Sequence, residues 1–322
     1  WEWDVIYNIP VLKNSSFKIP AASPALAKDD EGYFLIDSAD DFEEIAKDSS
    51  AKYRLANDLT VSGGEVPSVD IFFGEFDGQG HIMNGYSSSH PLFKELKPGA
   101  VLQNLSIVNA EVESDDAYVA IAVGLCDGAT ISGVKVHGNV TNTTNSENGT
   151  GGIVGQLKST SGSYLVENCS AQVNASAPAG YVGAIFGQSI TTGAKGEIRA
   201  CTAKGTVEGK SFVGGFGGRI MDSANVWVRD CVSSADISGS QHVGGFIGMA
   251  KGGVERCLQF RFRRAQSTVC GGFSINRRWP DSGGSHNAYR RSFSFLYQRK
   301  EHFPDHSDRP EREHGVCLPH GQ

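Results

Sequence analysis

The sequence predicts an all-β fold, and within that class a parallel β-helix, a solenoid of stacked coils about 30 residues long. Two observations predict it: a glycine motif recurs at a fixed period, and a second column of apolar residues keeps the same period. A third observation is that residues 60–257 show no 3.6-residue periodicity and consist of short runs rich in Val, Ile, Thr and Ala.

The glycine motif consists of a hydrophobic residue, one or two small residues, usually glycine, two apolar residues and a final glycine. Its closing glycines are spaced by 31, 32, 31 and 30 residues, at Gly124, Gly155, Gly187, Gly218 and Gly248. A constant period of this length is typical of stacked repeats. A helical interpretation is disfavoured, because each interior glycine would cost about 1 kcal/mol relative to alanine.

The second column lies half a period after each glycine motif. An apolar residue is followed three positions later by another, often cysteine, in Leu102/Leu105, Ile131/Val134, Val166/Cys169, Ile198/Cys201, Val228/Cys231 and Val254/Cys257. The residue before the second member is often Asn or Asp, which suits a turn. An up-and-down β fold is the alternative. The β-helix is favoured because the same residue types recur at the same coil position, and coils stacked about 4.8 Å apart would align them in ladders. A propeller blade needs about 40 residues or more.

Three regions follow from these patterns. Residues 1–32 are predicted to be a linker or the end of a preceding module, and residues 33–257 to be the solenoid. Ser38 and Asp41 are a plausible capping box for a short helix over about 39–47, which would cover the open end of the coil stack. The first strand then begins at Tyr53, and Thr143 to Asn148 is the longest insertion between coils.

The repeats resemble the GLUG family, whose repeat is named for a Gly-Leu-hydrophobic-Gly core. The resemblance covers roughly residues 33–257, including the upstream segments at 34–42 and 73–82. It implies a right-handed parallel β-helix in large exported proteins. These include adhesin-like bacterial surface proteins and the non-catalytic N-terminal region of zinc peptidases that cleave immunoglobulin A. The family offers no catalytic residues to carry over, and the peptidases' H-E-x-x-H is absent from this sequence.

Residues 258–322 have a different composition. They carry 11 Lys and Arg against 6 Asp and Glu, whereas residues 1–257 carry 18 against 30. Because the repeat stops in mid-coil, we interpret this segment as translation in a shifted reading frame and expect it to be disordered. A genuine basic tail for an acidic partner, or a linker, are the alternatives. The spacing of its His302, His306, His314 and Cys317 matches no strong zinc pattern.

Candidate site residues favour structural roles. We expect the cysteines at 169, 201, 231 and 257 to form a buried column, since free cysteine is among the most buried residue types. In the segment 77–81 the aspartate is expected to close a turn. His137 and His242 are expected to be solvated without partners, and Asp115-Asp116 to be an exposed turn. No column of carboxylates, as a polysaccharide hydrolase would need, is apparent.

The sequence therefore predicts a secreted or cell-surface, adhesin-like binding module without catalytic, cofactor or metal site residues. Its expected partner is a host protein or glycan bound on one long face of the solenoid and its protruding turns. The net charge of −7 argues against nucleic acid, and no apolar run is long enough to span a membrane. The rival hypotheses are the non-catalytic N-terminal part of a larger secreted zinc peptidase and a β-helix enzyme that degrades polysaccharide.

Overall fold

The protein is described here by a computed structural model. The structure describes the backbone of residues 2–4 and 9–11, and the full residues 23–61, 66–160, 162–191, 194–221 and 225–260. Outside the solenoid, β1 (Glu2–Asp4) and β2 (Ile9–Val11) form an antiparallel pair. The predicted tail lies outside the described residues from position 261 onward.

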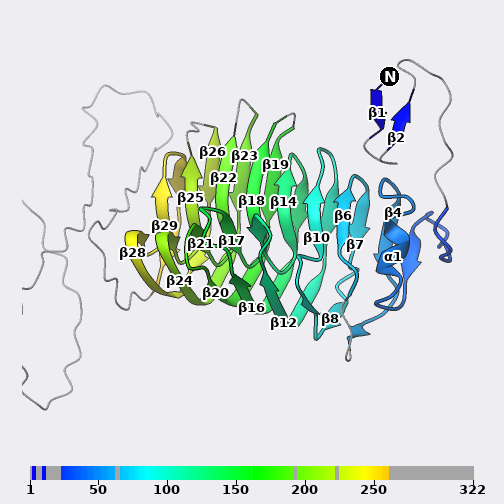
Figure 1. The fold of residues 1–322 in the computed structure, drawn as a ribbon, viewed down its shortest axis with the longest axis horizontal. Coiled ribbons are helices and arrows are strands. Elements are labelled where there is room, and N and C mark those ends of the chain that lie inside the picture. Colours follow the sequence, from blue (N-terminus) through cyan, green and yellow to red (C-terminus); the bar gives the residue numbers. More distant parts are fainter. Residues whose placement is uncertain are drawn as a thin grey trace, which may run out of the picture.

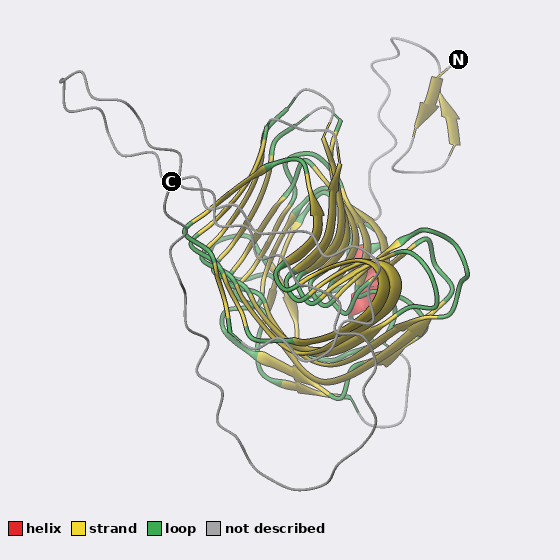
Figure 2. Ribbon diagram, turned by 90° about the vertical axis from the view of Figure 1, so that its left-hand side faces the viewer, coloured by secondary structure: helices red, strands yellow, loops and turns green. Residues whose placement is uncertain are grey.

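The solenoid consists of three parallel sheets stacked coil on coil through about six turns (Figure 1). A representative coil runs from β10 (Phe93–Leu96) to β11 (Val101–Gln103) and then to β12 (Ser106–Ser114), one strand for each sheet. Viewed down the axis, the coils superimpose around a common interior (Figure 2). The parallel β-helix predicted from the sequence is confirmed.

The strands of the three sheets have the following bounds. The seven-stranded sheet contains β6 (Val69–Phe72), β10, β14 (Val123–Asp127), β18 (Val154–Ser159), β22 (Phe186–Thr191), β25 (Gly217–Met221) and β29 (Ile247–Ala250). The nine-stranded sheet contains β3 (Phe34–Ile36), β4 (Lys52–Leu55), β7 (Glu75–Asp77), β11, β15 (Thr130–Ser132), β19 (Tyr164–Glu167), β23 (Gly196–Arg199), β26 (Val226–Arg229) and β30 (Gly253–Glu255). The thirteen-stranded sheet contains β5 (Leu59–Thr60), β8 (Ile82–Asn84), β9 (Ser87–Ser88), β12, β13 (Tyr118–Val119), β16 (Lys135–Asn142), β17 (Gly149–Gly151), β20 (Ser170–Ser176), β21 (Tyr181–Gly183), β24 (Thr202–Gly214), β27 (Val232–Ser233), β28 (Asp236–Gly244) and β31 (Leu258–Gln259).

The strand register reproduces the sequence period. In the seven-stranded sheet, Val123 pairs with Val154, which pairs with Phe186 one coil further on. In the nine-stranded sheet, the first members of the apolar pairs align from Leu102 through Ile131 and Val166 to Val254. Both columns predicted from the sequence are therefore real ladders of neighbouring residues.

The closing glycine of each motif allows two backbones to pack directly against each other. A Cβ atom on Gly187 would lie 2.2 Å from the Thr150 backbone nitrogen of the previous coil, and one on Gly218 would lie 2.6 Å from that of Val182. At these positions a strand of the seven-stranded sheet packs against a strand of the thirteen-stranded sheet, β22 against β17 and β25 against β21. The closing glycine of the motif thus marks a close backbone crossing in each coil.

A left-handed backbone position explains the recurring Asn and Asp. The residue that follows each strand of the nine-stranded sheet from β11 onward has positive φ. Its occupants are Asn104, Gly133, Asn168, Ala200, Asp230 and Arg256, with φ between 51° and 66°. Gly, Asn and Asp tolerate this conformation best, so the turn between two sheets selects them.

The interior is a continuous apolar core contributed by all three sheets. Phe186, Phe216 and Phe246 lie in adjacent coils, with ring centroids 6.1 and 4.6 Å apart. Cys169, Cys201, Cys231 and Cys257 are buried, and none is in a disulfide. The predicted column of small core residues is confirmed.

The helix α1 (Phe42–Ile45) lies at the N-terminal end of the stack, and the view down the axis places it within the outline of the coils (Figures 1 and 2). Phe42 and Ile45 are buried in the core, and the Phe42 ring packs against Phe76. The predicted helix over 39–47 was too long, since its ends are turns closed by i→i+3 hydrogen bonds.

The capping box is formed only in part. The Asp41 carboxylate accepts the Ser38 backbone N–H at 3.0 Å, as the motif predicts. The helix itself begins after Asp41, which makes no side-chain cap hydrogen bond to it. Immediately before the solenoid, Asp29 forms an ion pair with Arg54 at 2.6 Å, so the end of the segment 1–32 packs on the first coils.

Candidate binding groove

A groove of about 410 Å³ lies on the outer face of the thirteen-stranded sheet. It crosses β12, β16, β20 and β24, which are neighbours in that sheet (Figure 1). It is lined by Asn109, Ala110, Glu111, His137, Gly138, Asn139, Gln172, Val173, Asn174 and Gly205. Its volume falls within the range of about 300–1,000 Å³ that small-molecule sites occupy.

The groove follows a bend in four consecutive strands. Its floor is one register row, Ala110, Gly138, Val173 and Gly205. Gly138 and Gly205 have positive φ, of 156° and 105°, and the β12–β16 register shifts between Ile107 and Ala110. Asn109, with φ of 52°, is the extra residue of a β-bulge in β12 relative to β16. It is also one of the residues that line the groove.

The walls of the groove are outward-facing polar side chains. One wall carries a hydrogen-bonded ladder along the solenoid axis, in which Asn139 donates to Glu111 at 2.7 Å and Asn174 donates to Asn139 at 2.9 Å. Thr206 extends the ladder by donating to Asn174 at 2.8 Å. These contacts hold the amides in fixed positions before any ligand arrives.

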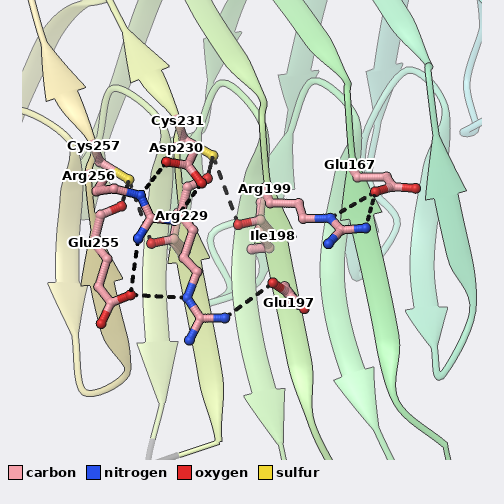
Figure 3. A network of polar contacts seen from close by, with 11 residues as sticks. Glu167, Glu197, Ile198, Arg199, Arg229, Asp230, Cys231, Glu255, Arg256 and Cys257 are labelled. Atoms are coloured by element: carbon pink, nitrogen blue, oxygen red, sulfur yellow. Dashed lines mark hydrogen bonds and ion pairs between the residues drawn. The ribbon is translucent and has the colours of Figure 1, made fainter. Parts of the chain in front are cut away.

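A second polar feature, a ladder of ion pairs, lies on the outer face of the nine-stranded sheet (Figure 3). Arg199 Nη2 and Glu167 are 2.6 Å apart, and Arg229 lies between Glu197 at 3.3 Å and Glu255 at 3.2 Å. The strand register places Asp77, Glu167 and Glu255 in one column. Gln103 and Ser132 lie between Asp77 and Glu167 in this row, and Arg199 and Arg229 lie between Glu167 and Glu255. These carboxylates are therefore not on adjacent coils, as a polysaccharide hydrolase would need.

The charges of this ladder are mutually compensated. Arg256 holds Asp230 at 2.6 Å and lowers the pKa of that carboxyl below its usual range. The hydrogen bond to Glu167 raises the pKa of Arg199. A general acid of a glycosidase needs a raised carboxyl pKa. The ion-paired Asp230 has the opposite shift.

The Asp77 turn has the structure predicted for it. Its carboxylate accepts the Gln79 backbone N–H at 2.9 Å and the Asn104 side-chain amide at 3.0 Å. His81 lies at the end of this turn but contacts Asp58 instead, with Nδ1 3.0 Å from the carboxylate. The turn therefore does not bring the Asp77 carboxylate and the His81 imidazole into hydrogen bonding.

The structure corrects two further expectations. Asp116 is not a simple exposed turn residue, because its carboxylate lies 2.8 Å from His90 Nδ1. His242 is not a solvated histidine without partners, because its ring stacks on Phe212 with centroids 4.3 Å apart. The partners are one coil away in each case, which the sequence alone does not show.

His137 is exposed and lies in the wall of the groove. The sequence pattern alone indicated an isolated surface histidine and gave Glu111, Asn139 and Asn174 no binding role. The signal that could have found them is the register of β12, β16 and β20, in which these three residues align.

The cysteine column is chemically shielded. Each thiol of the column lies near the carbonyl of the residue two positions earlier, for example Cys201 Sγ at 3.2 Å from the Arg199 oxygen. Burial raises the pKa of Cys126, which lies outside this column, to about 12. Hydrogen bonding with Cys201, together with burial, raises the pKa of Cys231 to about 12 as well. A thiolate is the reactive form, so these cysteines are poor nucleophiles in the folded chain.

Among the described residues, no three His, Cys, Asp or Glu side chains are grouped as a metal site would require. No helix in that part of the chain has the length and apolar character needed to cross a bilayer.

Comparison with solved structures finds a likeness to a crystal structure. It is that of a Bacteroides ovatus protein described as a candidate immunoglobulin A1 protease, with a TM-score of 0.60 and 21% sequence identity. The similarity covers 74% of this chain and 79% of that one, and at this identity it shows a shared fold. No protein-family model and no curated protein matches the sequence.

Proposed function

We propose that this chain is a non-catalytic recognition module of a secreted or cell-surface bacterial protein of the adhesin-like type. Its ligand, a host glycan or a host protein, binds on the outer face of the thirteen-stranded sheet. The observation that carries the proposal is the groove, whose walls repeat amide-bearing residues at matched positions of successive coils. The resemblance of the repeats to the GLUG family agrees with an exported protein.

The proposal is tested by binding the full chain to arrays of mammalian glycans and of host extracellular proteins. We expect a saturable ligand whose binding falls when Asn139 is replaced by Ala. Gln103→Ala is the matched control, because Gln103 also donates its amide to a carboxylate of the neighbouring coil, Glu75, but lies on the nine-stranded sheet. Binding that Gln103→Ala and Asn139→Ala impair equally would contradict a role for the groove.

The second candidate is the non-catalytic N-terminal part of a larger secreted zinc peptidase. The solenoid of the Bacteroides ovatus protein, described as a candidate immunoglobulin A1 protease, supports it. The test is to sequence the gene beyond the codon for Cys257 in all three frames. An H-E-x-x-H motif downstream would favour this candidate, and its absence from all frames would oppose it.

A polysaccharide-degrading enzyme is the third candidate, and the wide separation of Asp77, Glu167 and Glu255 along their register row does not favour it. Glycan cleavage that is lost in the Asp77→Asn, Asp115→Asn double variant would establish it. Turnover that is absent from the unmodified chain, with binding retained, supports the recognition module.

A further inference from the structure

We propose that the groove binds an extended, uncharged glycan along the solenoid axis, with one sugar unit to each coil. This inference rests on the proposed recognition function and names the class of ligand.

The first argument is geometric. Two successive coils contribute the same arrangement, a floor residue flanked by two outward side chains: His137-Gly138-Asn139 and Gln172-Val173-Asn174. The preceding coil extends it with Ala110 and Glu111 in register and Asn109 displaced by the β-bulge. Adjacent strands of a sheet lie about 4.8 Å apart. This is close to the length of one unit in an extended sugar chain, so a polymer with that repeat can present equivalent groups to each coil.

The second argument concerns hydrogen-bonding capacity. A side-chain amide offers two donors and two acceptor positions. In the ladder, Asn139 uses one donor toward Glu111 and one acceptor toward Asn174. One donor and one acceptor of Asn139 are therefore left for a ligand, and Asn174 is in the same state. Vicinal hydroxyls of a sugar carry the complementary pair of groups.

The third argument concerns charge. Among the lining residues, Glu111 is the one carboxylate, and it already accepts a hydrogen bond from Asn139. The lining contains neither Arg nor Lys. The cation Lys204 lies in β24 as the register partner of Gln172, at one end of the groove. A sulfated or uronic acid polymer would need a row of cations.

A peptide ligand is less well matched. Peptides commonly bind sheets by adding a strand to an exposed edge. The strands beneath the groove are interior ones, because β16 pairs with β12 on one side and with β20 on the other. Their backbone N–H and C=O groups already form hydrogen bonds between the strands. The groove walls present polar side chains to a ligand instead.

The experiment is isothermal titration calorimetry of the full chain with three neutral series of one to six units, the oligomers of N-acetylglucosamine, glucose and mannose. Heparin is the anionic comparison. We expect one neutral series to bind with an affinity that rises up to about three units and then levels off. Asn139→Ala should weaken the trisaccharide about tenfold, in keeping with one lost hydrogen bond. Gln103→Ala should leave it unchanged.

Circular dichroism and thermal unfolding of each variant separate a lost contact from a lost fold. If the chain binds a host protein through the groove but no neutral oligomer, the recognition function holds and the glycan inference fails. If heparin binds and the neutral series do not, the inference also fails. If neither Asn139→Ala nor the equivalent Asn174→Ala changes the binding of any glycan or host protein, both proposals fail.

Discussion

At the scale of single residues, backbone conformation decides more than side-chain chemistry. The corner after each strand of the nine-stranded sheet needs positive φ, and most coils place Asn, Asp or Gly there. Ala200 and Arg256 occupy the same corner with φ of 53° and 51°. Neither has a short polar side chain that compensates the left-handed conformation, so both positions carry backbone strain.

Ala200→Gly should therefore stabilise the chain. Glycine removes the Cβ clash, which is worth about 1–2 kcal/mol, and loses part of that gain through the entropy of the unfolded state. We expect a net gain of about 0.5–1 kcal/mol, measured as a higher urea midpoint. Ala203→Gly, three residues later in an extended strand, should instead destabilise. An Ala200→Gly protein with a lower midpoint would show that the corner is unstrained.

The closing glycines have the opposite requirement, since they need space and not conformational freedom. A methyl group on Gly187 would meet the backbone of the preceding coil, with the Thr150 nitrogen at 2.2 Å and the Gly149 carbonyl carbon at 2.5 Å. Gly187→Ala should cost about 3 kcal/mol, the upper end of what overpacking usually costs. Gly162→Ala, whose nearest contact would be 3.4 Å, should change the unfolding free energy by less than about 0.5 kcal/mol. Equal midpoints for the two variants would refute this explanation of the motif.

At the scale of elements, each coil adds one residue to every internal column. The solvent accessibility of the side chains in such a column therefore measures how tightly successive coils pack. The cysteines provide the chemical probe. They are buried, in no disulfide, and four of them occupy one coil position from Cys169 to Cys257.

Native-state alkylation should therefore be slow. In a Cys270→Ser, Cys317→Ser variant, iodoacetamide at pH 8 should label none of the five described cysteines within minutes, because all five are buried. The raised pKa values of Cys126 and Cys231 also suppress their thiolates. Urea should expose all five. Peptide mapping over hours should find Cys257 labelled first, since its exposed fraction of 3% is the largest of the five. Rapid native labelling of Cys201 would mean that the coil stack is open there.

Prediction from sequence succeeded where coil positions recur at equal intervals. The closing glycines and the pairs such as Val166/Cys169 keep nearly constant spacing, so their columns are visible without a structure. The groove walls are not visible, because Glu111, Asn139, Asn174 and Thr206 are separated by 28, 35 and 32 residues. The insertion Thr143 to Asn148 lengthens the interval between Asn139 and Asn174, and the strand register is needed to align the unequal coils.

At the scale of the whole molecule, the chain is quasi-one-dimensional, and each coil is stabilised by its neighbours. An exposed end of such a stack would present unpaired strand edges and apolar core to solvent. The helix α1 covers the core at the N-terminal end through Phe42 and Ile45, which are both buried. Its small size does not limit its importance, since it protects the first coil on which the next is stacked.

Phe42→Ala should thus affect both stability and association. Removal of a buried ring that packs on Phe76 should cost about 3–5 kcal/mol. The uncovered end should also favour association between copies, which size-exclusion chromatography at several protein concentrations would detect. Ile82→Ala, at a side chain that is 39% exposed, is the control and should alter neither property. If Phe42→Ala lowers the urea midpoint but stays monomeric at every concentration, α1 stabilises the first coil without protecting its edge.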